Sequence, residues 1–575
     1  TLFRSLGGPA VSFGDPAEAV AFLAAHPQVD ALAFGEGEPV ICDLVAALLD
    51  GNDLSAIPNL TWRGAKGVAV NPRAPAFRDL DVIPEISPAE VEVARTPGAG
   101  VALVYQTYRG CPYTCAYCSF HGGSAGIRRF DAERVEREMK RILDARADIV
   151  HFADSVFDLS AERAKRLLRF LNRNNHGTAL FFYTTFQNLD DELARLCEES
   201  RAQFEVGVQS MHADVLKRVK RHFNVERFRE TAQRVKRLRI NYYVDLMFGL
   251  PGDDMGRFRD TFNQIMALHA PFVMTFPLTV IPRSEMGQDP DGFELVRYDD
   301  AIVQEAVHPF SGIVYTNIGL YRGFTLADLS RYESLVTALF YAYQRYPVTL
   351  KVLSDYALGT AERGHGIDAF AVFETMGDRI RAQCKAIGFG YTGGDWPLIE
   401  STFRDTFLEV LRAMGGSADE LEAANALSRL ESGVDFLVNR VDRRGHFLAM
   451  KAREPRRLEG APAAVDKETV AFCVPHRLGR LPFRFDDLAR LAELQDRIPR
   501  KDTDVVALAP YDDWKVDVGE IDPVARVICE EVPEAREMPL KALARRMARR
   551  VPDTAWEEAL ADLVSRGILG VYHPG

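Results

Sequence analysis

Three of the eight cysteines in the chain lie within one short segment, at Cys111, Cys115 and Cys118. Their spacing is Cys-x3-Cys-x2-Cys, and thiolates are the soft ligands that iron–sulfur clusters need. Three cysteines in one loop bind three irons of a cubane, so the fourth iron stays open to bind and activate a ligand. A zinc site is the alternative interpretation. It normally takes four protein ligands, and His121 is the candidate for the fourth.

The remaining composition is that of a globular protein with one thiolate-rich site. The other five cysteines are scattered singly, which is typical of buried small side chains and not of a disulfide framework. This distribution predicts a reducing, cytoplasmic location. The net charge of −12 argues against broad binding of nucleic acid, which needs a basic surface. No apolar run approaches the roughly 20 residues of a membrane helix.

Residues 100–285 supply the elements that must position the cysteines, because they repeat one strand–helix unit. We expect strands at 101–105, 149–152, 180–184, 204–208, 242–248 and 272–280. We expect helices at 132–145, 161–172, 190–198, 225–238 and 255–268. Strands separated by helices form parallel βαβ units, so the region is predicted to be α/β, as a partial or full (β/α) barrel. The cysteine loop follows the first strand, at the edge where active sites lie.

The cysteine loop, with Tyr117 just before the third cysteine, resembles the signature of the radical S-adenosylmethionine (SAM) superfamily. The resemblance extends over residues 100–285. It implies that a 4Fe–4S cluster binds the amino and carboxylate groups of S-adenosylmethionine through its open iron. It also implies that an electron from the cluster cleaves the sulfonium and produces a 5′-deoxyadenosyl radical. Tyr117 is carried over with the loop as a cofactor-binding residue.

Later segments match the same superfamily in order. The resemblance assigns Asp154, after the second strand, to the methionine amino group. It assigns Glu205 and Gln209, on the fourth strand, to the ribose, and Arg221 to the methionine carboxylate. A guanidinium suits a carboxylate because both are planar and pair through two hydrogen bonds. Asp154 also suits a loop cap, and Glu205 also suits a partner of a nearby arginine.

The fifth strand ends in a turn that contains Gly249 and Pro251. The resemblance places this turn beside the adenine of S-adenosylmethionine. Ordinary turn chemistry explains the same two residues equally well.

The first 75 residues resemble the last part of a cobalamin-binding, Rossmann-like domain. The resemblance rests on Gly7 and Gly8 and on the Gly-Glu-Gly-Glu turn that contains Glu36, and it makes these three residues candidate cobalamin contacts. Glycine lets a backbone pass close to a cofactor. The chain opens at Thr1 without a methionine. We therefore expect further residues upstream, and we expect cobalamin to bind when the whole domain is present.

Three further regions complete the predicted organisation. Residues 76–99, rich in proline and acids, are expected to be a linker. Residues 286–520 are predicted to be mainly helical, with a helix at 335–345 and strand content at 434–450, and to shape the substrate site. Residues 521–575 contain three predicted helices and a short strand, which favours a winged-helix-like end.

The resemblance to the cobalamin-dependent subclass implies methyl transfer to an unactivated carbon or phosphorus of a small molecule or peptide. An external flavodoxin- or ferredoxin-like protein would then supply the electron. Cyclisation or rearrangement is an alternative, as is methylthiotransfer, although the latter enzymes carry a second cluster and only Cys42 lies upstream here. A peptide- or DNA-binding role of the C-terminal helices is an alternative of another class. No residue is assigned a catalytic role from the sequence.

Overall fold

The structure is a computed structural model of the 575-residue chain. It describes residues 5–6, 15–75, 78–87, 89, 91, 101–120, 126–235, 238, 240–268, 270, 272–307, 315–339, 368–386, 396–413, 418, 421–422, 425–429, 469–473, 476–483, 500–508, 517–533, 536–551 and 555–572. The chain divides into two compact units. The first unit comprises Thr1–Val156 and Ile281–Asp289, and the second comprises Phe157–Val280 and Pro290–Gly575.

The central sheet has six strands in the order β12-β11-β10-β9-β8-β5. The strands are β5 (Ala102–Tyr105), β8 (Ile149–Phe152), β9 (Ala179–Thr184), β10 (Gln203–Gln209), β11 (Asn241–Phe248) and β12 (Val273–Pro277). The β5–β8, β9–β10, β10–β11 and β11–β12 pairs are all parallel. The prediction of an α/β core with a parallel sheet is therefore confirmed, and the strands lie where the sequence pattern predicts them.

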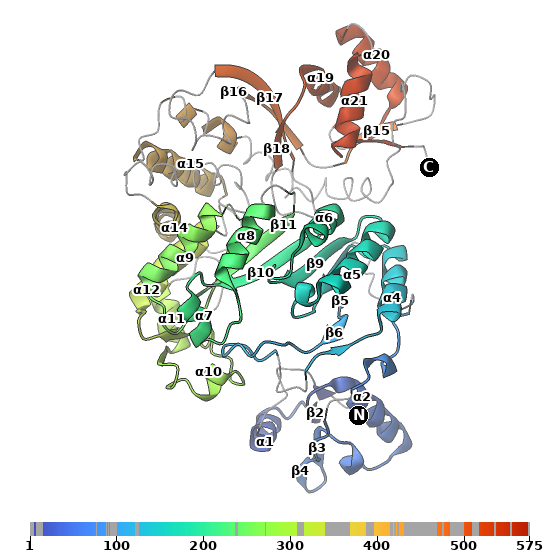
Figure 1. Ribbon diagram of the computed structural model, residues 1–575, viewed down its shortest axis with the longest axis vertical. Coiled ribbons are helices and arrows are strands. Elements are labelled where there is room, and N and C mark those ends of the chain that lie inside the picture. The colour runs from blue at the N-terminus through green and yellow to red at the C-terminus, as the bar shows by residue number, and fades with distance from the viewer. Residues whose placement is uncertain are drawn as a thin grey trace. The chain divides into compact units, whose positions relative to one another are not determined.

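Helices alternate with these strands in the chain. They are α4 (Ala132–Asp144), α5 (Ala161–Asn174), α6 (Asp191–Ser200), α7 (Ala213–Arg218), α8 (Val225–Val235) and α9 (Met255–Ala267). Several begin at an aspartate that accepts hydrogen bonds from backbone N–H groups of the first turn, as Asp131, Asp190 and Asp254 do. Helices α5, α6 and α8 lie over the strands β9 and β10 in Figure 1.

The strand β10 separates an apolar face of the sheet from a polar one. Phe204 and Val206 are fully buried, and Phe204 stacks on Phe182 of β9 with ring centroids 5.6 Å apart. The alternate residues Glu205 and Gly207 are only partly buried and point to the opposite face. The two-residue period thus delivers the predicted polar side chains to one surface of the sheet.

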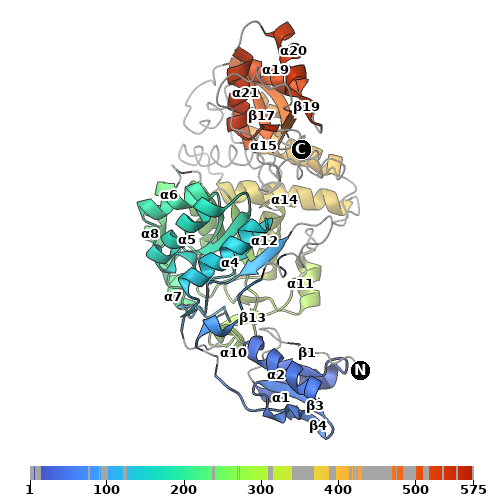
Figure 2. The same cartoon turned by 90° about the vertical axis from the view of Figure 1, so that its right-hand side faces the viewer.

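The N-terminal part of the first unit is a small α/β layer. Its strands are β1 (Ser5–Leu6), β2 (Ala31–Ala33), β3 (Leu60–Gly64) and β4 (Gly67–Val70), in that order, and only β1 and β2 are parallel. The helices α1 (Pro16–Ala25) and α2 (Gly37–Asp50) pack on these strands (Figure 2). Gly7 and Gly8 lie outside the described residues.

Residues 286–520 differ from the mainly helical prediction. Helix α12 (Leu326–Ala338) starts nine residues before the predicted 335–345, because Thr325 and Asp328 form a capping box that begins it. Helices α14 (Ala369–Ala386) and α15 (Trp396–Ala413) also lie in this region. The strand content expected at 434–450 lies outside the described residues. An antiparallel sheet forms later instead, from β16 (His476–Phe483), β17 (Arg500–Leu508) and β18 (Asp517–Glu520).

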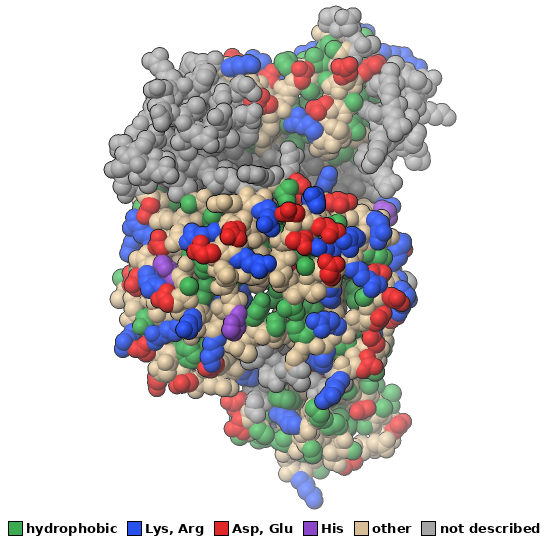
Figure 3. Space-filling model, viewed as in Figure 1, with side chains coloured by type: hydrophobic (Ala, Val, Ile, Leu, Met, Phe, Trp, Pro, Cys, Tyr) green, Lys and Arg blue, Asp and Glu red, His purple; other side chains and the backbone are tan. Residues whose placement is uncertain are grey.

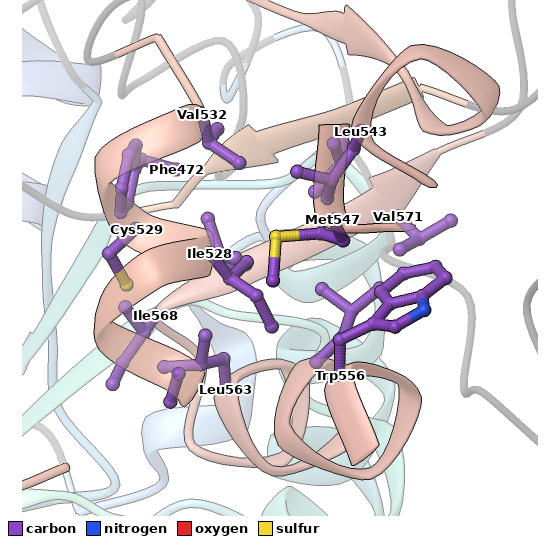
Figure 4. Close-up of a cluster of buried hydrophobic side chains, with 14 of the residues drawn as sticks. Phe472, Ile528, Cys529, Val532, Leu543, Met547, Trp556, Leu563, Ile568 and Val571 are labelled. Atoms are coloured by element: carbon purple, nitrogen blue, oxygen red, sulfur yellow. The ribbon is translucent and has the colours of Figure 1, made fainter. Parts of the chain in front are cut away.

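The C-terminal end contains the three predicted helices, α19 (Pro523–Glu531), α20 (Leu540–Arg550) and α21 (Ala555–Ser565). Its strand β20 (Leu569–Tyr572) pairs with β15 (Thr469–Phe472), which also pairs with β19 (Met538–Pro539). Ile528, Met547 and Trp556 join the three helices in one buried apolar cluster (Figure 4). No helix in the described parts of the chain has the length and apolarity of a membrane span.

Candidate functional site

The cysteine loop begins directly after β6 (Tyr108–Arg109) and contains all three predicted cluster ligands. Cys115 is buried, Cys111 and Cys118 are partly exposed, and all three are reduced cysteines. Tyr117 is also partly exposed. The loop turns tightly, since the Cys118 N–H donates to the Cys115 carbonyl at 3.0 Å, and the Phe120 N–H donates to the Cys118 Sγ at 3.3 Å. A sulfur that accepts a backbone N–H is suited to the thiolate form that binds iron.

The donor set fits an iron–sulfur cluster. Three reduced sulfurs come from one loop, and each cysteine of a cubane binds a different iron. Among the described residues, no three His, Cys, Asp or Glu side chains surround one position as ligands of a single metal ion. His121, the candidate fourth ligand of a zinc site, lies outside the described residues.

The entry of the loop has a backbone that only glycine fits. Gly110 has φ of +102°, and a Cβ on it would lie 2.5 Å from the Gly126 carbonyl oxygen. On the far side of the loop, Arg128 and Arg129 form β7, which pairs antiparallel with β6. The Met286 N–H also donates to the Ala116 carbonyl at 2.9 Å. The cysteine loop is therefore closed at its base by a two-stranded ladder.

Asp154 is almost fully buried after β8 and holds the residues that lead into the loop. Its Oδ1 accepts hydrogen bonds from the N–H groups of Thr107 at 2.7 Å and Tyr108 at 3.2 Å. Its Oδ2 accepts the Thr107 hydroxyl. The neighbouring Ser155 hydroxyl donates to the Gly110 carbonyl at 2.9 Å. The structure thus places Asp154 beneath the loop entry. This position corresponds to the loop cap that the sequence analysis gives as the alternative role of Asp154.

Glu36, predicted as a cobalamin contact, also lies against the loop entry in the structure. Its Oε1 accepts from Arg109 Nη1 at 3.1 Å and from Arg128 Nη2 at 2.8 Å, and its Oε2 accepts from Arg128 Nη1 at 2.8 Å. Both carboxylate oxygens are therefore engaged by arginines of the β6–β7 ladder.

The second unit brings three predicted residues together on the polar face of β10. A Cβ on Gly207 would lie 2.9 Å from Gln209 Nε2 and 3.1 Å from Arg221 Nη2. Arg221 donates to the Gly207 carbonyl. Gln209 has φ of +71°, a strained conformation for a residue other than glycine, and it sits at a β-bulge. The glycine leaves room for the amide and the guanidinium to converge beside Glu205.

Glu205 pairs with an acid that the sequence prediction did not select, Asp245 on β11. Burial, followed by the hydrogen bond and charge of Glu205, raises the pKa of Asp245 well above its ordinary value, while Arg221 opposes the shift. The Asp245 Oδ1 is buried without a hydrogen-bond partner among the described residues. The Tyr243 hydroxyl also donates to Glu205, and burial together with Glu205 raises the pKa of that phenol. The polar face therefore carries two paired acids, of which Asp245 also lies within reach of the Arg221 charge.

The turn after β11 is buried and contains the predicted Gly249 and Pro251. Gly249 has φ of +92°, and its carbonyl accepts from the Tyr321 N–H at 2.9 Å. A Cβ on Gly249 would meet the Leu320 side chain at 2.6 Å. Turn geometry thus requires glycine here, whatever ligand lies beside it.

Asp253 lies in the same turn, and its raised pKa predicts that the stability of the fold depends on pH. Burial raises its pKa from 3.8 to about 7, although the Asp254 N–H and the charge of Arg257 lower it. The folded state therefore favours the protonated acid. Its contribution to stability is full below about pH 4 and is lost as the pH rises through about 7.

The variant Asp253→Asn retains an acceptor for the Asp254 N–H but cannot ionise. At pH 8 we expect the free energy of unfolding of this variant to be about 1–2 kcal/mol higher than that of the wild type. At pH 4 we expect little difference between the two. Urea unfolding at both pH values measures this. An equal effect at both pH values would show that Asp253 does not titrate in this range.

The sequence does not predict several residues at the base of the cysteine loop and on the polar face of β10. Thr107, Tyr108 and Ser155 act through hydrogen bonds between segments more than 40 positions apart, for which no local pattern exists. Asp245 and Tyr243 lie within a segment that the resemblance covers. The β10–β11 register places Tyr243 opposite Glu205 and Asp245 opposite Gly207, and the sequence pattern does not supply this register.

Comparisons with known proteins match the part of the chain that contains the cysteine loop and the parallel sheet. The model of the radical SAM superfamily matches residues 105–265. The chain is 26% identical over 286 residues to the cobalamin-dependent radical SAM methyltransferase TokK of Streptomyces tokunonensis, covering 45% of this chain and 40% of that protein. It is 27% identical over 285 residues to the 2-(S-pantetheinyl)-carbapenam-3-carboxylate methyltransferase of Streptantibioticus cattleyicolor, with the same coverage. The matches thus span less than half the length of these relatives.

A solved structure is also similar in part. The radical S-adenosylmethionine methyltransferase TsrM from Kitasatospora setae, with cobalamin and a [4Fe-4S] cluster bound, is 21% identical, with a TM-score of 0.40. The match covers 53% of this chain and 58% of that one. From the cysteine loop, the parallel sheet and the match of the superfamily model, residues 105–265 are a radical SAM domain.

Proposed function

We propose that the protein is a radical SAM enzyme that binds a 4Fe–4S cluster through Cys111, Cys115 and Cys118. The observation that carries the proposal is the cysteine loop itself. It presents three reduced sulfurs from a segment whose base is fixed by the β6–β7 ladder. When bound, the cluster supplies the electron that cleaves S-adenosylmethionine reductively. The ladder limits how far the backbone that carries the three sulfurs can move.

The polar face of β10 is the proposed site for S-adenosylmethionine. Arg221 binds the methionine carboxylate, because its guanidinium lies over Gly207 on this face of the strand. Gln209 and Glu205 bind the ribose hydroxyls, and the turn at Gly249 and Pro251 lies beside the adenine. Asp245, whose pKa is raised by burial and by Glu205, hydrogen-bonds Glu205 and so orients that side chain.

Asp154 and Tyr117 take different roles in the proposal. The buried Asp154 carboxylate accepts three hydrogen bonds from Thr107 and Tyr108. Its proposed role is therefore to position the loop, and not to bind the methionine amino group. Tyr117 is partly exposed and stays a candidate for contact with the cofactor.

The proposed reaction is cobalamin-dependent methyl transfer to an unactivated carbon or phosphorus of a natural product or peptide. Two relatives in the methyltransferase class support this reaction type. The N-terminal layer of β1–β4, α1 and α2 supports a place for cobalamin, with Gly7 and Gly8 as proposed contacts. A flavodoxin- or ferredoxin-like protein is the proposed electron donor. Cobalamin supplies the methyl carrier when bound.

The contacts of the C-terminal helices disfavour the DNA-binding alternative. Arg546 and Arg550 of the basic helix α20 are paired with Glu531 of α19. The helix α21 carries acidic residues in its first turn. Basic and acidic side chains are also interspersed over the described surface in view in Figure 3. A nucleic-acid surface needs unpaired basic charge along one face.

The test is anaerobic reconstitution of the full chain with iron and sulfide, followed by reduction and addition of S-adenosylmethionine and cobalamin. We expect a spectrum of a 4Fe–4S cluster, a separate cobalamin spectrum, and formation of 5′-deoxyadenosine and methionine. A reconstituted chain that binds iron yet leaves S-adenosylmethionine intact contradicts the proposal. A second, independent cluster would favour methylthiotransfer, and 5′-deoxyadenosine without cobalamin binding would favour cyclisation or rearrangement.

A further inference from the structure

Glu36 and Glu38 hold the two arginines that face each other across the base of the cysteine loop. Arg109 and Arg128 are register partners in the β6–β7 ladder. Glu36 accepts from both of them, at 3.1 Å from Arg109 and at 2.8 Å twice from Arg128. Glu38 accepts from Arg109. We call these four residues the Glu–Arg bridge.

The bridge is better shielded than an ordinary surface ion pair. The side chains of Arg109, Arg128 and Glu36 are only 19%, 13% and 18% exposed, and Glu38, at 40%, is the exposed member. Two positive and two negative charges balance within the bridge, and Arg128 meets Glu36 through two parallel hydrogen bonds. Such bidentate, partly buried pairs are stronger than exposed ones. Against the opposing effect of burial, the hydrogen bonds of Glu38 and Glu36 raise the pKa of Arg109.

Glu36 serves the bridge instead of its own helix. It occupies the N-cap position of α2, but its side chain makes no capping hydrogen bond. A helix start normally directs an acceptor side chain back to its own N–H groups. Here both carboxylate oxygens reach segments more than 70 positions away in the sequence.

The bridge adds a restraint that the rest of the loop base lacks. Asp154 and Ser155 fix Thr107, Tyr108 and Gly110 from the end of β8. Arg109 lies among these residues, two positions before Cys111, and its guanidinium reaches the N-terminal layer. A shift of the start of α2 is therefore transmitted to the backbone next to the first cluster ligand.

We infer that Glu36 and Glu38 are positioning residues that couple the N-terminal α/β layer to the geometry of the cysteine loop through Arg109 and Arg128. The inference rests on the proposed function only in taking this loop as the cluster site. It gives Glu36 a role that does not depend on contact with cobalamin. The N-terminal layer would then influence how firmly the loop retains iron.

A matched control exists in the same unit. Glu85 also bridges two arginines, with Oε1 2.7 Å from Arg137 Nη2 and Oε2 2.6 Å from Arg141 Nη1. Neither arginine belongs to the cysteine loop or its base. Glu85→Gln removes the same charge from a more exposed bridge between one glutamate and two arginines, at a place that does not restrain the loop.

The experiment compares backbone hydrogen exchange in the full chain for the wild type, Glu36→Gln, Arg128→Gln, the double variant and Glu85→Gln. Without added iron, we expect Glu36→Gln to speed hydrogen exchange about tenfold in peptides that span residues 107–118. This factor corresponds to the loss of one charge-assisted hydrogen bond. Glu85→Gln should leave those peptides unchanged. The double variant should exchange no faster than the faster single variant, because both substitutions break one bridge.

A second readout uses the reconstituted chain. Iron release to a chelator should be faster in Glu36→Gln than in Glu85→Gln, with equal thermal unfolding temperatures. Equal exchange in Glu36→Gln and Glu85→Gln, or additive effects in the double variant, would overturn the inference. If no variant took up iron, the proposed function would fail, and the exchange data would still decide whether the bridge restrains the loop.

Discussion

Replacement of Cys115 by alanine is expected to abolish both the iron–sulfur cluster and the cleavage of S-adenosylmethionine. Cys115 is the buried member of the three cysteines. Two thiolates from one loop cannot hold a cubane against solvent, since each cysteine binds a different iron. We expect iron content after anaerobic reconstitution to fall to background, and 5′-deoxyadenosine formation to fall by more than about a hundredfold.

Cys197 supplies the matched control for this experiment. It is a buried cysteine on α6, and burial raises its pKa well above the ordinary value, so it stays a thiol. Cys197→Ala removes an equally buried sulfur without touching the loop. We expect it to keep its iron and its activity. A Cys115→Ala variant that retained iron at the level of Cys197→Ala would contradict the assignment of the cluster.

Replacement of Asp154 by alanine is expected to cost about 3 kcal/mol or more in the stability of the first unit. The change leaves the N–H groups of Thr107 and Tyr108 and the Thr107 hydroxyl without their acceptor. Each buried donor left unsatisfied costs about 1–3 kcal/mol. Because these residues lead into Cys111, iron should also be lost faster. Chemical unfolding and chelator assays measure the two effects.

Two further variants separate the roles of Asp154. Asp148→Ala removes a carboxylate that accepts from one N–H, that of Val101 at the start of β5, so we expect a smaller loss of stability and no change in iron release. Asp154→Asn keeps an acceptor for the backbone. If Asp154→Asn weakened binding of S-adenosylmethionine while leaving stability and iron release unchanged, Asp154 would be a cofactor ligand and the positioning role would be wrong.

The sequence predicted the parts of the molecule that local patterns control. Alternating strands and helices identified the parallel sheet, because period and segment length are local properties. The cysteine loop is a local pattern too, because its three cysteines lie within one short segment. The start of α12 differs from the predicted one, although the Thr325–Asp328 capping box that begins the helix is a local signal.

Contacts between distant segments could not be predicted from one sequence. Glu36 and Arg128 are 92 positions apart, and nothing in either segment indicates the other. The strand β15 pairs with β19 and β20 across a similarly large separation, and the sequence pattern predicts only one short strand at this end. The three donors to Asp154 belong to residues that follow β5, and the pairing of β5 with β8 brings them to it across more than 40 positions.

The most direct test of the central claim is the Mössbauer spectrum of the chain reconstituted with ⁵⁷Fe, recorded with and without S-adenosylmethionine. A cubane held by three cysteines has one iron without a cysteine ligand, so we expect S-adenosylmethionine to change the signal of a single iron site. A spectrum without cluster iron, or a cluster whose irons all stay unchanged when S-adenosylmethionine is added, would contradict it.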